Sequence, residues 1–339
     1  MNFLSDTTAP AHPALIEALA NANEGFAPSY GADPVSAAVK QRLQDVFETD
    51  LEVVFTVSGT ASNALALSVL CSPDEMVLCH DEAHIHRDER GAPEFFTRGG
   101  KLLPLAGDHA KISPESLADT LRQWPSDFVH TTPPAVLSLS QLNESGCAYT
   151  LDELGVLIEL AKGRDLKVHM DGARFSNALV SLDCTPAEMT WKAGVDVLSL
   201  GATKNGAMAS EAIILFPSVT DRLPQLLANQ KRAGLMLPKM RYVSAQMEAW
   251  LKNGLWLELA RSANAAAKRL SDGLAAVDGA ELVHPTHGNE VFIRLTDELA
   301  TRLREAGAGF YSWPDGSARF VASWCTTDAE ITALLKAAG

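Results

Sequence analysis

Cysteine is scarce in this sequence of 339 residues and follows no metal-binding spacing. The five cysteines are Cys71, Cys79, Cys147, Cys184 and Cys325. Because they are scattered, odd in number and without a CxxC pair, they argue against both a zinc ribbon and a disulfide framework. We therefore expect reduced thiols, as in a cytosolic protein.

Long apolar runs are absent as well. No run approaches the ~18 uninterrupted apolar residues of a membrane-spanning helix. The N-terminal stretch MNFLSDTTAPAHPALIEAL has no basic segment followed by an apolar core, so it does not read as a signal peptide. The sequence thus predicts no membrane partner and a cytoplasmic location.

Positive charge is in the minority. There are 28 Lys and Arg residues against 42 Asp and Glu residues, which gives a formal net charge of −14. So acidic a chain has no general affinity for nucleic acid phosphates or anionic membranes. We therefore expect a small-molecule partner and no nucleic acid. With 47% hydrophobic residues, the chain is long enough for one large domain and a smaller one.

Short apolar runs alternate with segments of helical period and predict an α/β fold. Strands are expected at 53–57, 76–80, 101–105, 128–132, 167–171, 195–200 and 212–216. Helices are expected at 61–70, 113–123, 151–163 and 186–193. Strands joined by helical crossovers form a mainly parallel sheet with helices on both faces, and such sheets bind ligands beyond the carboxyl ends of their strands.

The pattern changes after about residue 219. Long helical stretches are followed by strands expected at 281–285, 290–295 and 318–324. This mixture indicates a small α+β domain, with the N-terminal arm as a candidate addition to it. We divide the chain into an N-terminal arm at 1–20, a large domain at 21–250 and a small C-terminal domain at 251–339.

A solitary lysine, Lys204, lies in VDVLSLGATKNGAMASEAIILF (195–216), on a tight connection between two β-prone runs. Its neighbours are small, and Gly201 and Gly206 leave room for a large group to approach the backbone. Lys204 is therefore a candidate for a pocket floor. The alternative is a solvated hairpin loop whose lysine only aids solubility.

In FTVSGTASNALALSVL a strand ends at Val57, and Ser58, Gly59 and Thr60 open a helix. Free backbone N–H groups and the positive end of the helix dipole suit a phosphate monoester there. The turn lacks the lysine of a Walker loop and the third glycine of a dinucleotide fingerprint. The alternative is an ordinary N-cap, in which Ser58 or Thr60 satisfies the helix donors.

In LKVHMDGARFSNA a strand runs into Asp171, and Arg174 follows. A carboxylate that ends a buried strand needs a cationic partner, because an isolated ionised Asp would be very costly there. The alternative is a helix N-cap with Arg174 as a surface charge.

The three segments supply the parts that a pyridoxal phosphate enzyme requires. A lysine binds the cofactor covalently, a carboxylate keeps the pyridine nitrogen protonated, and a helix start binds the phosphate. Here all three lie at the carboxyl ends of expected strands.

The chain resembles the low-specificity L-threonine aldolases, within the fold-type I, aspartate aminotransferase-like pyridoxal phosphate enzymes. The motifs are LSDTTAP (4–10), YGADP (30–34), SGTASN (58–63), AHIHRDERGAP (83–93), HMDGARFSNA (169–178) and SLGATKNG (199–206). The resemblance implies pyridoxal 5'-phosphate as cofactor and a large domain plus a small α+β C-terminal domain. It also implies retro-aldol cleavage of L-threonine, L-allo-threonine and related β-hydroxy-α-amino acids, such as phenylserine, to glycine and an aldehyde.

The resemblance also assigns roles to residues. Lys204 matches the cofactor lysine, Asp171 the partner of the pyridine nitrogen, and 58–60 the phosphate turn. His84 matches a histidine that stacks on the pyridine ring and is a candidate for handling the β-hydroxyl proton. Glu89 matches a family acid by spacing. The groups expected to hold the substrate carboxylate are Ser5, Arg174 and Arg319, since an arginine fork binds a carboxylate through two parallel hydrogen bonds.

Tyr30 and Lys231 resemble residues that reach the site across a subunit interface. The resemblance therefore implies a homo-oligomer, a dimer or a tetramer, with shared active sites. The segment 138–146 departs from the family, because it has Gln141 and Asn143 but no histidine, so a second imidazole is missing. After Lys231 the chain has LMLPKM in place of a glycine run.

Three alternatives remain open, and one of them is a non-catalytic binding protein, which predicts no spectral change on adding amino acids. The same scaffold could carry out β-elimination or transamination with pyridoxal phosphate, because a fold alone does not fix the reaction. His80, His84 and His86 could instead bind a metal ion in a hydrolase, since an HxH pair on an extended segment can face one ion. On the principal interpretation no metal site is expected.

Overall fold

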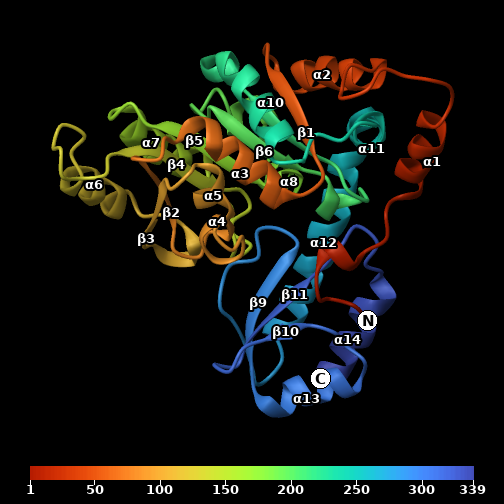
Figure 1. Cartoon of the computed structure of the whole chain (residues 1–339). Helices are drawn as coiled ribbons and strands as arrows, with labels where there is room; N and C mark the ends of the chain where they lie inside the picture. The colour runs from red at the N-terminus through yellow and green to blue at the C-terminus, as the bar shows by residue number, and fades with distance from the viewer.

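The computed structural model describes all residues, 1–339, in two lobes (Figure 1). The larger lobe is built on a seven-stranded sheet of order β1-β7-β6-β5-β4-β2-β3. Its strands are β1 (Glu52–Thr56), β2 (Met76–His80), β3 (Lys101–Leu105), β4 (Pro134–Ser140), β5 (Lys167–Gly172), β6 (Val197–Gly201) and β7 (Glu211–Leu215). β7 pairs antiparallel with β1 and β6, and the other pairs are parallel. The predicted α/β class with a mainly parallel sheet is confirmed.

One expected strand is wrong. The segment 128–132 forms turns, and the strand in this position is β4, at Pro134–Ser140. Phe128 and Val129 are 52% and 88% exposed, whereas Val136 and Leu137 are fully buried between β2 and β5. Partners in the sheet, rather than local β-propensity, therefore decide which apolar run becomes the strand.

Helices cover both faces of the large sheet. They are α1 (Pro13–Ala22), α2 (Pro34–Phe47), α3 (Gly59–Leu70), α4 (His84–Arg87), α5 (Ala92–Phe96), α6 (Pro114–Gln123), α7 (Leu151–Lys162), α8 (Phe175–Leu182), α9 (Pro186–Met189), α10 (Leu223–Arg232) and α11 (Arg241–Leu251), with short 3-10 turns η1 (Asp6–Thr8), η2 (Asp108–Ala110), η3 (Thr203–Asn205), η4 (Pro217–Arg222) and η5 (Lys252–Gly254). The expected helix at 186–193 is shorter, and α8 was not expected. Helix α3 is buried nearly all round, as its sequence of small and apolar residues requires.

The smaller lobe has a four-stranded antiparallel sheet of order β10-β11-β9-β8. Its elements are α12 (Leu255–Ala275), β8 (Ala280–Leu282), β9 (Glu290–Leu295), α13 (Asp297–Glu305), β10 (Tyr311–Ser312), β11 (Ser317–Val321) and α14 (Asp328–Ala338). Phe3 of the N-terminal arm is buried in the core of this lobe, and its backbone pairs with Gly309 and Val321. Helix α12 contacts α8 as well as β8 and β9, so the domain boundary at residue 250 stays a prediction.

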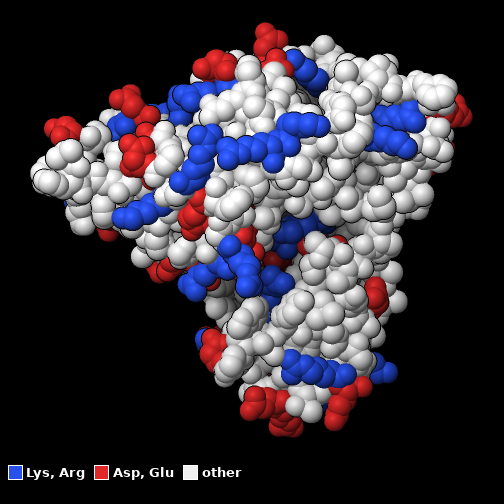
Figure 2. All heavy atoms as spheres, in the orientation of Figure 1, with Lys and Arg blue, Asp and Glu red and all other residues white.

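The two lobes meet in a hollow on the face drawn in Figure 2, where Lys and Arg side chains gather although the chain as a whole is acidic. A basic rim of this kind raises the local concentration of small anions. No helix of the chain has both the length and the apolar character needed to cross a membrane. The five cysteines are all free thiols.

Candidate active site

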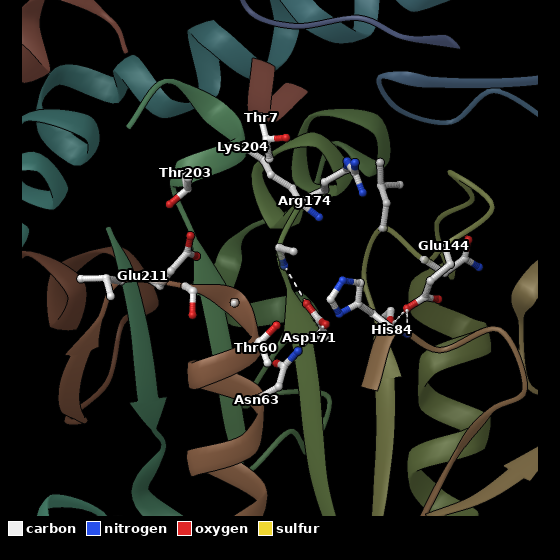
Figure 3. A pocket seen from close by; sticks show the side chains of 17 residues that line it. Thr7, Thr60, Asn63, His84, Glu144, Asp171, Arg174, Thr203, Lys204 and Glu211 are labelled. Atoms are coloured by element: carbon white, nitrogen blue, oxygen red, sulfur yellow. Dashed lines mark hydrogen bonds between the residues drawn. The ribbon is translucent and has the colours of Figure 1, made fainter. Parts of the chain in front are cut away.

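A cavity of about 270 Å³ opens at the carboxyl ends of β1, β4, β5 and β6. The residues that line it come from seven separate segments of the chain, and their side chains point into the same space (Figure 3). They include Thr7, Ser58, Gly59, Thr60, Asn63, His84, Ser140, Asn143, Glu144, Asp171, Arg174, Thr203, Lys204 and Glu211. The edge of the sheet at which the sequence predicts function is therefore the edge that is hollowed.

Lys204 lies in η3, on the connection between β6 and β7, as expected. Two hydrogen bonds hold the turn against α11 and α12. Asn205 donates to the carbonyl of Trp256 at 2.8 Å, and its own carbonyl accepts from Trp250 Nε1 at 2.9 Å. Gly206 has φ +98°, a conformation that favours glycine, and closes the turn. The amine of Lys204 has no hydrogen bond or ion pair within the chain, and the residue lines the cavity. A free amine on a rigid turn is what a covalent partner needs.

Asp171 lies in β5 and is 7% exposed. Its Oδ2 accepts a hydrogen bond from Asn63 Nδ2 at 2.7 Å, and its Oδ1 accepts from the backbone N–H of Ala173 at 3.0 Å. The side chain is thus oriented by α3 on one side and by its own turn on the other. It does not cap α8, whose N-cap residue is Arg174, so the N-cap alternative for Asp171 is wrong.

Asn63 also joins Asp171 to His84. The same Nδ2 donates to Glu89 Oε1 at 2.9 Å, and Glu89 Oε1 lies 2.8 Å from His84 Nδ1. The hydrogen bond with Glu89 raises the pKa of His84, while burial raises the pKa of Glu89. Glu89 therefore fixes the orientation of the imidazole and favours its protonated form.

The turn at the start of α3 has the expected N-cap, and the phosphate site stays a prediction that its geometry fits. Ser58 is the N-cap, and its Oγ accepts from the backbone N–H of Ala61 at 3.2 Å. Gly59 and Thr60 line the cavity, and a Cβ added at Gly59 would have no heavy atom within 4 Å. The first turn of α3 therefore directs backbone donors and its positive dipole end into open space, which suits a phosphate.

Arg174 lines the cavity, but acidic side chains already surround it. Its Nε and Nη2 donate to Asp6 at 2.8 and 3.2 Å, and its Nη1 lies 3.2 Å from Glu290 Oε2. Burial acts to lower the pKa of Arg174, but Asp6 and Glu290 outweigh it and raise the pKa. Arg319 does not line the cavity; its Nη1 lies 3.8 Å from Glu290 Oε1. Glu290 thus bridges the two arginines predicted to bind the substrate carboxylate.

Three other predicted site residues do not line the cavity. Ser5 caps η1, where its Oγ accepts from the backbone N–H of Thr7 at 3.2 Å, and Thr7 reaches the cavity instead. Tyr30 and Lys231 lie together, with the amine 4.6 Å from the centre of the phenol ring. Tyr30 is 48% exposed, so the pair is available to a neighbouring molecule.

The sequence analysis did not predict two acids of the cavity wall, the buried Glu211 and the half-buried Glu144. Burial raises the pKa of both Glu144 and Glu211 from 4.5 to about 7. Glu211 is the first residue of β7, in the sequence SEAIILF. A single acidic residue at the start of a buried strand is the sequence feature from which it could have been predicted. Glu144 lies within the segment 138–146, which lacks the histidine expected from the family. Its neighbours Gln141 and Asn143 instead hold the local backbone, through Tyr149 and Ala110 respectively.

The residues proposed for a metal hydrolase do not converge. His80 is 5% exposed; its Nε2 lies 3.0 Å from the carbonyl of Gly107, and its Nδ1 accepts from the backbone of Glu82. The side chains that do come together are those of His84, Glu89 and Asp171, and the hydrogen bonds through Asn63 explain that grouping. The HxH interpretation is therefore wrong for this fold.

Comparison with known proteins agrees with this geometry. Residues 2–298 match the family described as Beta-eliminating lyase. The chain is 40% identical over 334 residues to the low specificity L-threonine aldolase of Pseudomonas sp. (strain NCIMB 10558). The aligned part is 98% of this chain and 95% of the relative. The fold of this chain matches a Leishmania major threonine aldolase with a TM-score of 0.91 at 28% identity, over 99% and 97% of the two chains.

A Thermus thermophilus aspartate aminotransferase shares the fold, with a TM-score of 0.72 at 16% identity over 99% of this chain and 94% of that chain. The predicted aspartate aminotransferase-like, fold-type I architecture is confirmed, and so is the resemblance to the L-threonine aldolases. The chain belongs to the beta-eliminating lyase family.

Proposed function

We propose that this protein is a pyridoxal 5'-phosphate-dependent aldehyde-lyase, a low-specificity L-threonine aldolase. Its substrates are L-threonine, L-allo-threonine and related β-hydroxy-α-amino acids, phenylserine included, which it cleaves to glycine and an aldehyde. The observation that carries the proposal is the free amine of Lys204 in the same cavity as the carboxylate of Asp171 and the start of α3. The names of the Pseudomonas and Leishmania relatives support the same reaction.

The side chains present fit the cofactor. Lys204 supplies an amine without a partner, Asp171 a carboxylate oriented by two donors, and Gly59 an open cradle at a helix N-terminus. When bound, pyridoxal phosphate supplies an electron sink for the electron pair released at the substrate Cα. Lys204 would hold its carbonyl carbon, Asp171 its pyridine nitrogen and the turn at 58–60 its phosphate, while His84 would lie against the ring.

The substrate carboxylate binds among the arginines. Asp6 and Glu290 already pair with Arg174 and Arg319, but the buried Nε of Arg319 has no hydrogen-bond partner. A carboxylate that reaches this point can accept from a planar guanidinium fork. Ser5, next to the lining residue Thr7, completes the proposed group.

Fixing the carboxylate also selects the reaction. With the amino and carboxylate groups held, rotation about the substrate N–Cα bond would stop, so the side chains of the site would fix which bond at Cα is placed for cleavage. For a β-hydroxy amino acid that bond is Cα–Cβ, so cleavage releases an aldehyde. Transamination or β-elimination from this site would require a different bond in that position.

We further propose that the protein is cytoplasmic and works as a homo-oligomer, a homotetramer built from dimers that share active sites. Tyr30 and Lys231 would reach the site of a neighbouring subunit, since they lie together on the surface and outside their own cavity. Size-exclusion chromatography with light scattering tests this assembly, and Lys231→Ala should lower activity without changing the subunit fold.

The direct test is to incubate the purified holoenzyme with threonine, allo-threonine and phenylserine, each as L and D forms, and to measure aldehyde and glycine. We expect both products from the L forms and neither from Lys204→Ala. Release of a keto acid with ammonia, or of a keto acid with the aminated cofactor, would assign β-elimination or transamination instead.

A further inference from the structure

Glu144 lies on the wall of the cavity beside His84, across from Thr203 and Glu211 (Figure 3). It follows the end of β4 by four residues, so its backbone is anchored to the sheet edge. One carboxylate oxygen, Oε1, accepts two hydrogen bonds: from the backbone N–H of His84 at 2.9 Å and from Ser140 Oγ at 2.6 Å. The other oxygen, Oε2, is buried and has no hydrogen-bond partner in the chain.

This asymmetry separates the two oxygens by role. Two donors on Oε1 stabilise negative charge or a carbonyl oxygen there, and the backbone N–H of His84 has no lone pair with which to accept a proton. A proton on this carboxyl group therefore resides on Oε2. A buried oxygen without a partner is costly unless something else hydrogen-bonds to it. Because Glu144 lines the cavity, a molecule bound there can supply that hydrogen bond.

The groups that face Glu144 leave it poised between its two charge states. Burial raises its pKa to about 7, the hydrogen bond from Ser140 acts to lower it, and the charge of Asp171 on β5 acts to raise it. The charge of Glu144 also acts on Cys79 of β2 and on Tyr149, but burial raises the pKa of both, so they stay uncharged near neutral pH. A general base functions best when its pKa lies close to the working pH.

His84, the other candidate for proton transfer, is committed elsewhere. Its Nδ1 is held by Glu89, and that hydrogen bond raises the pKa of His84. A raised pKa favours the imidazolium form of His84, which donates and has no lone pair with which to accept a further proton. A carboxylate on the same wall of the cavity is therefore a second candidate acceptor for the proton of the substrate hydroxyl.

We propose that Glu144 is that acceptor, and that its Oε2 takes the β-hydroxyl proton of the substrate; this rests on the aldolase function proposed above. As the O–H bond breaks, the proton passes to Oε2 and the oxygen electron pair forms the carbonyl of the aldehyde. Bound pyridoxal phosphate would supply the sink for the electron pair of the broken Cα–Cβ bond. Glu144 returns its proton to water after the aldehyde leaves, and Cα of glycine takes up one proton, so the overall reaction neither gains nor loses protons.

The test compares the wild-type holoenzyme with Glu144→Gln, which keeps the shape and an Oε1 acceptor but cannot take a proton. We expect kcat/KM for L-threonine cleavage to fall by roughly 10²- to 10⁴-fold, the range for loss of a general base. In the wild type, kcat/KM should rise with pH as a group with a pKa of about 7 loses its proton. This ascending limb of the pH profile should be absent from the variant. Glu159→Gln, an exposed site on α7, serves as the matched control and should retain both rate and limb.

Two further measurements separate proton transfer from general damage to the site. Exchange of the α-protons of glycine in deuterated water, followed by NMR, needs no β-hydroxyl group and should persist in Glu144→Gln. In the apoenzyme, the infrared difference between wild type and variant at pH 6 should contain the band of a protonated carboxyl group, which disappears at pH 8.5.

The outcomes distinguish the inference from the function on which it rests. If the wild type releases no aldehyde from L-threonine, the proposed function is wrong. If the wild type cleaves threonine and Glu144→Gln cleaves it as fast, or loses glycine exchange in the same proportion as cleavage, the role of Glu144 as the β-hydroxyl base is refuted. Loss of cleavage with retained exchange supports it.

Discussion

The guanidinium of Arg174 donates two hydrogen bonds to the carboxylate of Asp6, at 2.8 Å from Nε and 3.2 Å from Nη2. The two residues are 168 positions apart in the sequence. Asn289, in the smaller lobe, donates to the same carboxylate at 3.0 Å. One buried carboxylate from the N-terminal arm therefore joins the arm, the large lobe and the small lobe at the edge of the cavity, so the site and the junction between lobes depend on the same contacts.

Asp6→Asn should destabilise this junction. The change leaves Arg174 with Glu290 as its one remaining acidic contact within 4 Å, and breaking a buried ion pair from one side costs about 3 kcal/mol. Burial acts to raise the pKa of Asp6, but Arg174 and Lys204 together hold it below 3.8. A carboxyl group whose pKa is lower in the folded than in the unfolded protein stabilises the fold at pH values above its unfolded pKa. This stabilisation is lost as the pH falls through the folded pKa.

The difference between wild type and Asp6→Asn should therefore be complete at pH 6 and shrink below pH ~4. Urea unfolding of the apoenzyme at several pH values measures it. Asp278→Asn, at an exposed position without an ion pair, should unfold as the wild type does. Equal stabilities of Asp6→Asn and wild type at pH 6 would contradict the role given to this pair.

Asn63→Ala should damage the site more than the fold. Asn63 donates to both Asp171 and Glu89, and a hydrogen bond to a charged group is worth about 1.5–3 kcal/mol. We expect kcat/KM to fall about 10- to 100-fold and cofactor binding to weaken, because Asp171 and the His84–Glu89 pair lose their common support. Absorbance titration of the apoenzyme with pyridoxal phosphate measures the binding.

Asn229→Ala is the matched control for this change. Asn229 donates to Ser68 of α3 at 2.8 Å and has no hydrogen bond to a carboxylate. It should lose some stability and no cofactor affinity. If both asparagine variants bind the cofactor like the wild type, the link from Asn63 to the site is incidental.

Much of the site could be predicted because its parts follow directly after strands. Lys204 follows β6 and the turn at Gly59 follows β1, while Asp171 lies at the end of β5, and the carboxyl ends of neighbouring parallel strands share one edge. The Arg174–Asp6–Glu290 cluster could not be predicted, because its members come from three regions whose association no local pattern encodes. The misplaced strand at 128–132 has the same cause: Phe128 is β-prone, but its segment finds no partner in the sheet.

Glu211→Gln should remove a pH dependence of stability. Burial raises the pKa of Glu211 from 4.5 to about 7. Between those two values the unfolded chain has released this proton while the folded protein still holds it, so the stability of the wild type falls as the pH rises. The variant should therefore gain stability relative to the wild type from pH 5 to pH 8, by up to roughly 3 kcal/mol.

Urea unfolding of the two apoenzymes at pH 5 and pH 8 gives the comparison. Glu258→Gln, at an exposed position of α12, should run parallel to the wild type. A constant difference between Glu211→Gln and wild type across this range would mean that Glu211 is ionised throughout in the folded protein.

Gly59→Ala should separate cofactor binding from folding. A Cβ at this position meets no heavy atom within 4 Å, so the change fits the chain and, by restricting the unfolded state, should stabilise the apoenzyme by roughly 0.5 kcal/mol. The same methyl group enters the space where the phosphate approaches the start of α3, so the affinity for pyridoxal phosphate should fall at least about tenfold, a loss of about 1.4 kcal/mol. Gly155→Ala, in the middle of α7 and equally unobstructed, should stabilise the apoenzyme while leaving the cofactor affinity unchanged. Equal affinities in the two alanine variants would place the phosphate away from this turn.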